Sequence, residues 1–174
     1  MSTIDLIVLG MLKKQPLSAY ELQKLVDYRH ISHWVKISTP SIYKKVLQLE
    51  EKGYISGQPE RTGKMPEKTV YSLTAAGDLE FERLMLEVAC QPINIFLAFN
   101  AVIVNLAGLS AEKQSFCLAG IEDNLKILKS YIQENLWLKE KSADIPATGL
   151  AVLRQQLALA ETLEKWLADL LPKT

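Results

Sequence analysis

Apolar residues recur at helical spacing through much of the first 90 positions of the chain. An apolar run over residues 4–12 predicts a first helix, which Gln15-Pro16 ends because the residue before a proline disfavours helical backbone. A second helix is predicted from Ser18 to about Tyr28. Ser18 and Glu21 have the spacing of a capping box, in which each side chain bonds the backbone amide of the other residue.

A third helix is predicted over residues 39–52. Thr39 is a suitable N-cap, and Pro40 suits the first helical position because its missing N–H would have no helical partner there. Gly53 follows as a residue that readily adopts the left-handed backbone at which helices end. The apolar stripe expected to be buried consists of Ile42, Val46 and Leu49.

The hydrophobic period then changes from helical to alternating. Residues 54–58 and 69–73 predict two short strands of a hairpin, and Thr74 caps a further helix that continues to about Ala89. Three helices, a hairpin and a helix, joined by short connections, have the element order of a winged helix-turn-helix. We therefore assign residues 1–90 to an N-terminal winged helix-turn-helix domain that binds DNA.

The second half of the chain predicts helices only. Residues 93–106 are apolar on most sides, which predicts a buried helix. A long helix from Ser110 to about Glu140, and a last helix that ends near Leu171, each carry a narrow apolar stripe. Such a stripe needs a partner within the chain or in a second subunit. We expect a mainly α fold, with residues 91–174 forming a C-terminal helical hairpin that dimerises.

Composition and charge narrow the classes of function. The chain has 174 residues, of which 48% are hydrophobic and 23% charged, as expected for a folded protein. The net charge of zero argues against binding nucleic acid through the whole surface. Residues 1–77 nevertheless carry 11 basic and 7 acidic side chains, whereas residues 78–174 carry 9 and 13. The asymmetry indicates nucleic-acid contact in the first part, with chance as the alternative.

The sequence shows no pattern typical of a signal peptide, a membrane span, a disulfide framework or a cysteine metal site. The first residues lack the basic start of a signal peptide, and the apolar stretch over residues 93–109 is shorter than the roughly 20 residues of a membrane span. Cys90 and Cys117 do not have the spacing of a disulfide framework or metal site. We expect a cytoplasmic protein that contacts no membrane.

The third predicted helix combines an apolar back with a polar front, as a helix that reads the DNA major groove requires. Its candidate DNA contacts are Thr39, Ser41, Lys44, Lys45 and Gln48. The hairpin adds basic candidates for the neighbouring backbone or minor groove, namely Arg61, Lys64 and Lys68. The alternatives are an ordinary solvated helix face and a hairpin whose charges prevent edge pairing. The combination of helix, hairpin and charge asymmetry favours DNA contact.

Several segments resemble the PadR family of bacterial transcription regulators. They are Ser41-Ile42-Tyr43, the stretch from Leu47 through Glu50 and Gly53 to Ile55, the stretch Val70-Tyr71-Ser72-Leu73-Thr74-Ala75-Ala76-Gly77, and an opening over residues 7–12 and 16–22. The family commonly has glycine where this chain has Ala19, and a more basic wing than residues 63–68. The resemblance covers about residues 4–77. The length of the remainder is similar to that of the larger subgroup, which has a virulence-activator-like C-terminal domain.

The resemblance implies a homodimer joined by the C-terminal helices, with two winged domains that read a two-fold-related operator in double-stranded DNA. It also implies that Tyr20 and Tyr43 contact phosphates, whereas the residues alone leave packing at the rim of the core as an alternative. A ligand would act by changing the distance between the winged domains, and repression would follow from occluding a promoter.

The remaining candidates are aromatic. Trp34, Trp137 and Trp166 are weak candidates for stacking a planar effector, with core or interface packing as the alternative. His30 and His33 lack a third metal ligand nearby, and no catalytic set of residues is recognisable. We expect no enzyme activity, no cofactor and no metal.

The sequence thus predicts a ligand-responsive transcriptional repressor that binds its operator as a homodimer. The alternative is a winged-helix module that binds another protein and not DNA. The operator, the effector, the target genes and the choice between repression and activation stay open at this level.

Overall fold

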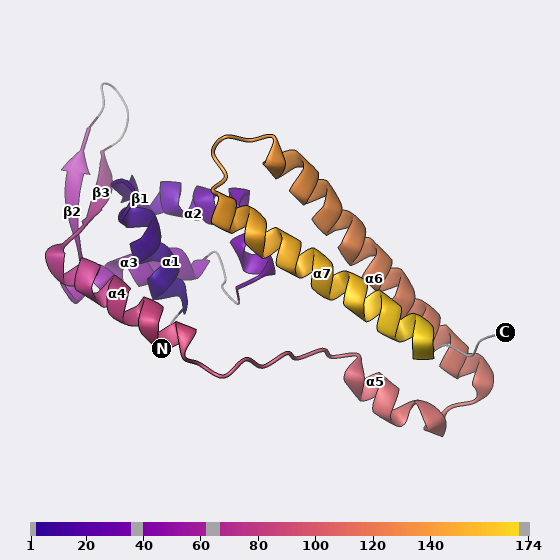
Figure 1. Ribbon diagram of the computed structural model, residues 1–174. Helices are drawn as coiled ribbons and strands as arrows, with labels where there is room; N and C mark the ends of the chain where they lie inside the picture. Colours follow the sequence, from indigo (N-terminus) through magenta and orange to yellow (C-terminus); the bar gives the residue numbers. More distant parts are fainter. Residues whose placement is uncertain (1–2, 36–39, 62–66, 171–174) are drawn as a thin grey trace. The chain divides into compact units, whose positions relative to one another are not determined.

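The computed structural model describes residues 3–35, 40–61 and 67–170, and the chain divides into two compact units, Met1–Asn94 and Ile95–Thr174 (Figure 1). The fold is mainly helical with one small sheet, and the first unit has the winged-helix element order that the sequence predicts.

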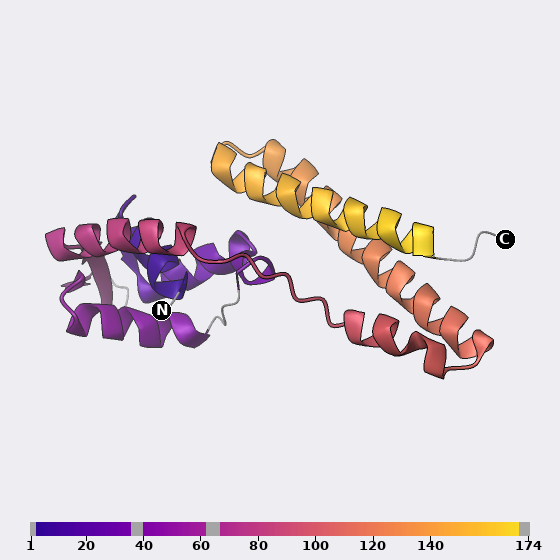
Figure 2. The ribbon, with the colours of Figure 1, turned by 60° about the horizontal axis from the view of Figure 1, so that its bottom comes forward.

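The first unit contains the predicted helices and the predicted hairpin. The helices are α1 (Thr3–Leu12), α2 (Ala19–Tyr28), the 3₁₀-helix η1 (Ile31–His33), α3 (Pro40–Glu51) and α4 (Ala75–Ala89). Helix α1 packs against both α3 and α4 and lies between them (Figure 2). The capping box at the start of α2 is confirmed: the Ser18 amide donates to Glu21 Oε2 at 2.8 Å, and the Glu21 amide donates to Ser18 Oγ at 3.3 Å.

The sheet has three antiparallel strands in the order β1-β3-β2, where β1 is Leu17–Ser18, β2 is Ile55–Glu60 and β3 is Lys68–Leu73. The hairpin of β2 and β3 is the predicted wing, two residues longer at the end of its first strand than the sequence indicated. Pro59 is tolerated there because β2 lies at the edge of the sheet. Strand β1 was not predicted, since two residues are too short to give an alternating pattern.

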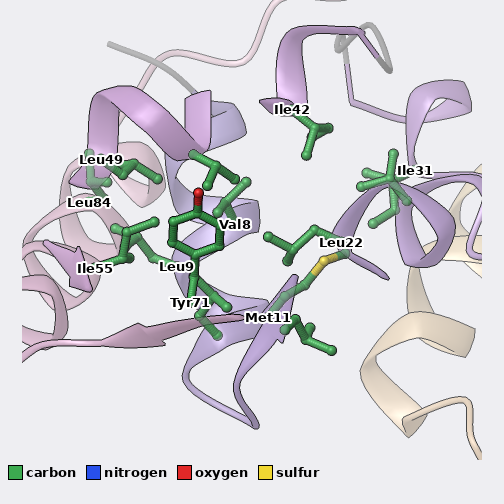
Figure 3. Packing of buried hydrophobic residues seen from close by; sticks show 14 residues of the cluster. Val8, Leu9, Met11, Leu22, Ile31, Ile42, Leu49, Ile55, Tyr71 and Leu84 are labelled. Atoms are coloured by element: carbon green, nitrogen blue, oxygen red, sulfur yellow. The ribbon is translucent and has the colours of Figure 1, made fainter. Parts of the chain in front are cut away.

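The core of the first unit is built from the predicted stripe of α3 and the apolar residues that face it. Ile42, Val46 and Leu49 are at most 1% exposed, and they join a single buried cluster with residues of α1, α2, the sheet and α4 (Figure 3). Complete burial of one such aliphatic side chain stabilises a fold by about 1.5–3 kcal/mol. The stripe therefore fixes which face of α3 points away from the protein.

The end of α3, the start of β2 and the start of α4 meet at one backbone carbonyl. Gly53 has a φ of 73°, as predicted for the residue that ends the helix. The carbonyl of Tyr54 then accepts the amide of Thr74 at 3.1 Å and its hydroxyl at 3.0 Å. The Thr74 hydroxyl also caps α4 by accepting the Gly77 amide at 3.1 Å. A Cβ atom at Gly77 would lie 1.9 Å from the Tyr54 carbonyl oxygen.

The second unit contains α5 (Asn100–Asn105), the 3₁₀-helix η2 (Leu106–Gly108), α6 (Ala111–Glu140) and α7 (Ala147–Leu170). Helices α6 and α7 form the predicted antiparallel hairpin (Figure 1). Their most buried apolar residues repeat every seven positions, namely Leu118, Leu125 and Ile132 in α6 and Leu153, Ala160 and Leu167 in α7. Ion pairs between Lys129 and Glu164 (2.6 Å) and between Arg154 and Glu140 (2.8 Å) border this seam.

The prediction of a helix over the whole of residues 93–106 was wrong, and the burial expected for this segment is absent within the single chain. Only Asn100–Asn105 is α-helical, and the side chains of Ile93 and Phe96 are each 91% exposed. A uniformly apolar segment has no polar face to orient it, so apolar content alone specifies neither a helix nor the surface that covers it. Among the described helices, none is long and apolar enough to cross a bilayer.

Substitution of Gly77 by alanine should strongly destabilise the first unit. The added Cβ would overlap the Tyr54 carbonyl, which belongs to the backbone and is already held by two hydrogen bonds, so we expect a loss of about 3 kcal/mol or more in the free energy of unfolding. Urea unfolding followed by circular dichroism measures this. Gly108→Ala is the control, because its added Cβ meets no atom within 4 Å. Equal effects of the two substitutions would show that the Tyr54 carbonyl leaves room for a side chain at position 77.

Candidate nucleic-acid interface

The exposed side of α3 carries an aromatic, a basic and an aliphatic side chain. Tyr43 is 47% exposed and Leu47 is 61% exposed, and Lys44 between them also points to solvent. Gln48 is half-buried. These residues occupy the positions between the buried stripe residues, as helical periodicity requires. Three of the predicted contacts, Tyr43, Lys44 and Gln48, thus lie on the accessible part of α3.

Lys45 does not lie on that face, so its expected outward position was wrong. Its Nζ is 2.9 Å from Asp5 Oδ1 of α1, and the two side chains are only 17% and 15% exposed. Asp5 Oδ1 accepts no hydrogen bond of good geometry, so the attraction is mainly Coulombic. Position 45 precedes the buried Val46 and follows Ile42 by three residues, which turns it toward α1. The ion pair ties α3 to α1.

A groove of about 500 Å³ lies beside α3, between the first turns of α2 and strand β3. Its polar and aromatic lining includes Tyr20, Glu21, Lys24, Tyr43 and Lys68. Tyr20 is 57% exposed, and the Lys24 ammonium stands 4.7 Å from the centre of its ring. Both tyrosines that the family resemblance implicated therefore line one groove together with basic side chains.

Glu21 is the acidic member of this groove and bonds three donors. Its Oε2 accepts the Ser18 amide at 2.8 Å and the Ser18 hydroxyl at 2.7 Å, while its Oε1 accepts the Lys68 ammonium at 2.9 Å. The backbone and side-chain hydrogen bonds from Ser18, together with Lys68, lower the pKa of Glu21 to about 2. The hydrogen bond to Glu21 raises the pKa of Lys68 in turn. This pair joins the base of the wing to the start of α2.

The other predicted contacts fall at the edges of the described structure. Arg61 is exposed directly after β2. Thr39 and Lys64 lie outside the described residues, and Ser41 is described only as a backbone residue of α3. Lys24 and Leu47 also line the groove, although neither was among the predicted contacts. The four-residue spacing of Tyr20 and Lys24 on one helix was the available signal for the first of them.

Two of the three tryptophans proposed as effector contacts are engaged within the second unit. The Trp166 ring stacks on Phe99 with a centroid distance of 5.9 Å, and the Lys141 ammonium lies 3.3 Å from the centre of the Trp137 ring. Trp34 follows η1 and is 36% exposed. Within residues 3–35, 40–61 and 67–170, no cluster of three or more His, Cys, Asp or Glu side chains could hold a metal ion.

The Glu21 carboxylate should make the stability of the first unit depend on acid. Its folded pKa lies below the unfolded value, so its contribution is complete above about pH 4.5 and is lost as the pH falls toward 2. Because its side chain is 40% exposed, we discount the electrostatic part for screening and expect Glu21→Ala to lose about 1 kcal/mol at pH 7. Urea unfolding of both proteins at pH 7, 4 and 2.5 measures the difference. A difference that does not shrink with acid would contradict the assignment.

Comparison with known proteins gives a family match and a set of similar structures. Residues 8–83 match the model of the "Transcriptional regulator PadR-like family". Bacillus subtilis PadR in complex with operator DNA has a TM-score of 0.81 at 23% identity, with 97% of each chain covered. The same protein in complex with p-coumaric acid has a TM-score of 0.79 at 20% identity, with 98% of this chain and 96% of that one covered.

A third similar structure is the Vibrio cholerae virulence activator AphA, with a TM-score of 0.70 at 18% identity and coverage of 96% and 95%. No curated protein sequence gives a significant match. At these identities the structures establish the fold, whereas the family model matches the sequence of the winged unit from α1 to α4. Residues 8–83 therefore form a domain that belongs to the PadR-like family of transcriptional regulators.

Proposed function

We propose that the protein is a DNA-binding transcriptional regulator that acts as a homodimeric, ligand-responsive repressor in the cytoplasm. The observation that carries the proposal is the coincidence of the family match with an accessible face on α3 and an adjoining groove lined by Tyr20, Tyr43 and Lys24. The family consists of transcriptional regulators, which are not enzymes. This membership favours DNA over the alternative of a module that binds only proteins.

Helix α3 is the element that enters the major groove in this proposal. Its buried stripe holds it on the core and leaves Lys44 and Gln48 toward the DNA, where a glutamine can bond adenine and a lysine can bond guanine or phosphate. Thr39 and Ser41, at the start of the helix, would donate to phosphate oxygens. Lys45 contributes indirectly, since its ion pair with Asp5 fixes α3 against α1.

The DNA backbone would run along the groove beside α3. The exposed Tyr20 and Tyr43 would each donate a hydroxyl hydrogen bond to a phosphate, and Lys24 adds a positive charge over the Tyr20 ring. The wing, with Arg61 directly after β2 and Lys64 in the sequence between β2 and β3, would follow the neighbouring backbone or minor groove. Bacillus subtilis PadR has been crystallised in complex with operator DNA, which supports double-stranded DNA as the ligand of the similar fold of this chain.

Dimerisation is proposed on the apolar surface of the second unit. Phe116, Ile127 and Leu138 of α6 are 80%, 68% and 53% exposed. They are spaced eleven residues apart, which aligns them along one side of the helix, because eleven residues make just over three full turns. That side is opposite Leu118 and Leu125, which face α7. A second copy of the chain is the proposed partner for this stripe and for the exposed Phe96.

Two winged domains in such a dimer would present two α3 helices to DNA. Half-sites would then lie about 34 Å apart, or a multiple of this distance, along a two-fold-related operator. A ligand that alters the separation of the two domains would alter operator affinity. Bacillus subtilis PadR in complex with p-coumaric acid suggests phenolic acids as the first compounds to test.

DNA binding is tested with a labelled duplex of the upstream region of the gene, titrated at several salt concentrations. We expect affinity to fall steeply with salt because lysine–phosphate contacts release counterions. Lys44→Gln should lower the affinity and reduce the slope of log K against log salt by about 0.9, the value for one phosphate contact. Failure of the wild-type protein to bind the duplex at low salt would refute the proposed function.

Lys45→Gln is the matched control at the neighbouring position, with the same change in charge. Because Lys45 is paired with Asp5 inside the protein, we expect an unchanged salt slope and a loss of about 1 kcal/mol in unfolding free energy. Lys44→Gln should leave the unfolding free energy within about 0.5 kcal/mol of wild type. Equal salt slopes for the two variants would show that α3 does not use Lys44 in the proposed way.

The dimer is tested by charge insertion into the stripe of α6. Phe116→Glu combined with Ile127→Glu should convert a dimer to a monomer, because the carboxylates would be buried without partners at the interface. Sedimentation velocity measures the mass, and circular dichroism verifies that the hairpin stays helical. Gln133→Glu, at an exposed position on a different side of α6, is the control and should stay dimeric. A double variant with the wild-type mass would contradict this interface.

A further inference from the structure

The groove beside α3 contains an unexpected charge for a surface that follows DNA. Glu21 lines it together with Lys24 and Lys68, so its three charged side chains sum to only one positive charge. Donors of the protein itself occupy both oxygens of the Glu21 carboxylate. Ser18 supplies two donors to one carboxylate oxygen, and Lys68 supplies its ammonium to the other. The pair of Glu21 and Lys68 is thus held at a fixed place by the first turn of α2.

We propose that Glu21 is a positioning residue that restrains Lys68 from binding phosphate and thereby limits sequence-independent affinity for DNA. The inference rests on the proposed function and extends it, since it concerns how strongly the same groove binds any duplex. The Glu21 side chain is 40% exposed and the Lys68 side chain 45%, so both reach the surface along which a phosphate would lie. The carboxylate neutralises the nearest lysine and also repels the phosphate.

The restraint is stable because the first turn of α2 supports it. Glu21 occupies the N3 position of a capping box, and its carboxylate is stabilised by the Ser18 amide independently of Lys68. Lys68 Nζ therefore meets a preformed, ionised acceptor 2.9 Å away, whereas a phosphate would have to displace it. The alternative use of the same geometry is that Glu21 orients Lys68 so that its remaining N–H groups donate to phosphate. The two uses predict opposite changes when Glu21 loses its charge.

The test compares the affinities of the wild-type protein and of Glu21→Gln for a random-sequence duplex. Contacts to the DNA backbone contribute to this affinity, whereas sequence-specific base contacts do not. Glu21→Gln keeps an N3 residue that can complete the capping box and removes the charge that holds Lys68. We expect five- to tenfold tighter binding at about 0.1 M salt, and a slope of log K against log salt steeper by about 0.9, equivalent to one added phosphate contact. The operator duplex serves in parallel as the probe of the proposed function.

Three further variants isolate the cause. Glu21→Gln combined with Lys68→Gln should lose the gain, because no lysine is released. Lys68→Gln alone should leave the wild-type slope unchanged, and this variant tests the inference even if Glu21→Gln lowers stability. Glu82→Gln removes an equal charge from the exposed side of α4, outside the groove, and should leave affinity and slope as in wild type.

The outcomes separate the inference from the function on which it rests. Weaker binding and a shallower slope in Glu21→Gln, or a slope shallower by about 0.9 in Lys68→Gln, would overturn the restraint and assign Lys68 to phosphate in the wild-type protein. A gain in Glu21→Gln that persists without Lys68 would overturn it as well. Wild-type protein that binds neither duplex would remove the proposed function together with the inference.

Discussion

The carbonyl of Tyr54 is the point on which the arrangement of the winged unit depends. It lies one residue after the left-handed Gly53 that ends α3, and it accepts two hydrogen bonds from Thr74 at the start of α4. The Thr74 hydroxyl is also 2.7 Å from the Gly53 carbonyl. The carbonyl of Tyr54, which lies between the end of α3 and the start of β2, thus connects both elements to the first turn of α4. Gly77 is required because only a hydrogen atom fits against that carbonyl.

This junction determines how the wing stands relative to α3. The Gly57 amide of β2 donates to Glu50 Oε1 of α3 at 2.9 Å, and the Glu21 pair attaches Lys68 of β3 to α2. The wing base is therefore connected to two helices through carboxylates, one at each strand. Lys45 and Lys68 are both satisfied by acidic partners within the protein. A count of lysines along the chain would thus overestimate the positive charge available to a polyanion.

Local rules predicted most of the first unit. The capping box at Ser18, the left-handed Gly53 and the stripe of α3 each depend on residues within one or two helical turns, and the structure has all three. The pairs of Lys45 with Asp5 and of Lys68 with Glu21 join residues 40 and 47 positions apart, which no local pattern encodes. The helix predicted for residues 93–99 is absent for a related reason: their sequence is apolar, but no local pattern specifies which surface packs against these side chains. The groove likewise arises only when α2, α3 and β3 are assembled.

In the proposed dimer, the uncovered apolar residues of the second unit would tie folding to protein abundance. In the proposed dimer, Phe96, Phe116 and Ile127 are shielded only after two chains meet, so the stability of each chain rises with its concentration. A newly synthesised chain would expose these side chains to solvent until it dimerises. At low concentration the exposure would last longer and would favour aggregation or proteolysis. The cellular concentration of the folded protein would then rise more than linearly with its rate of synthesis. The lifetime of the protein would thus depend on its rate of synthesis.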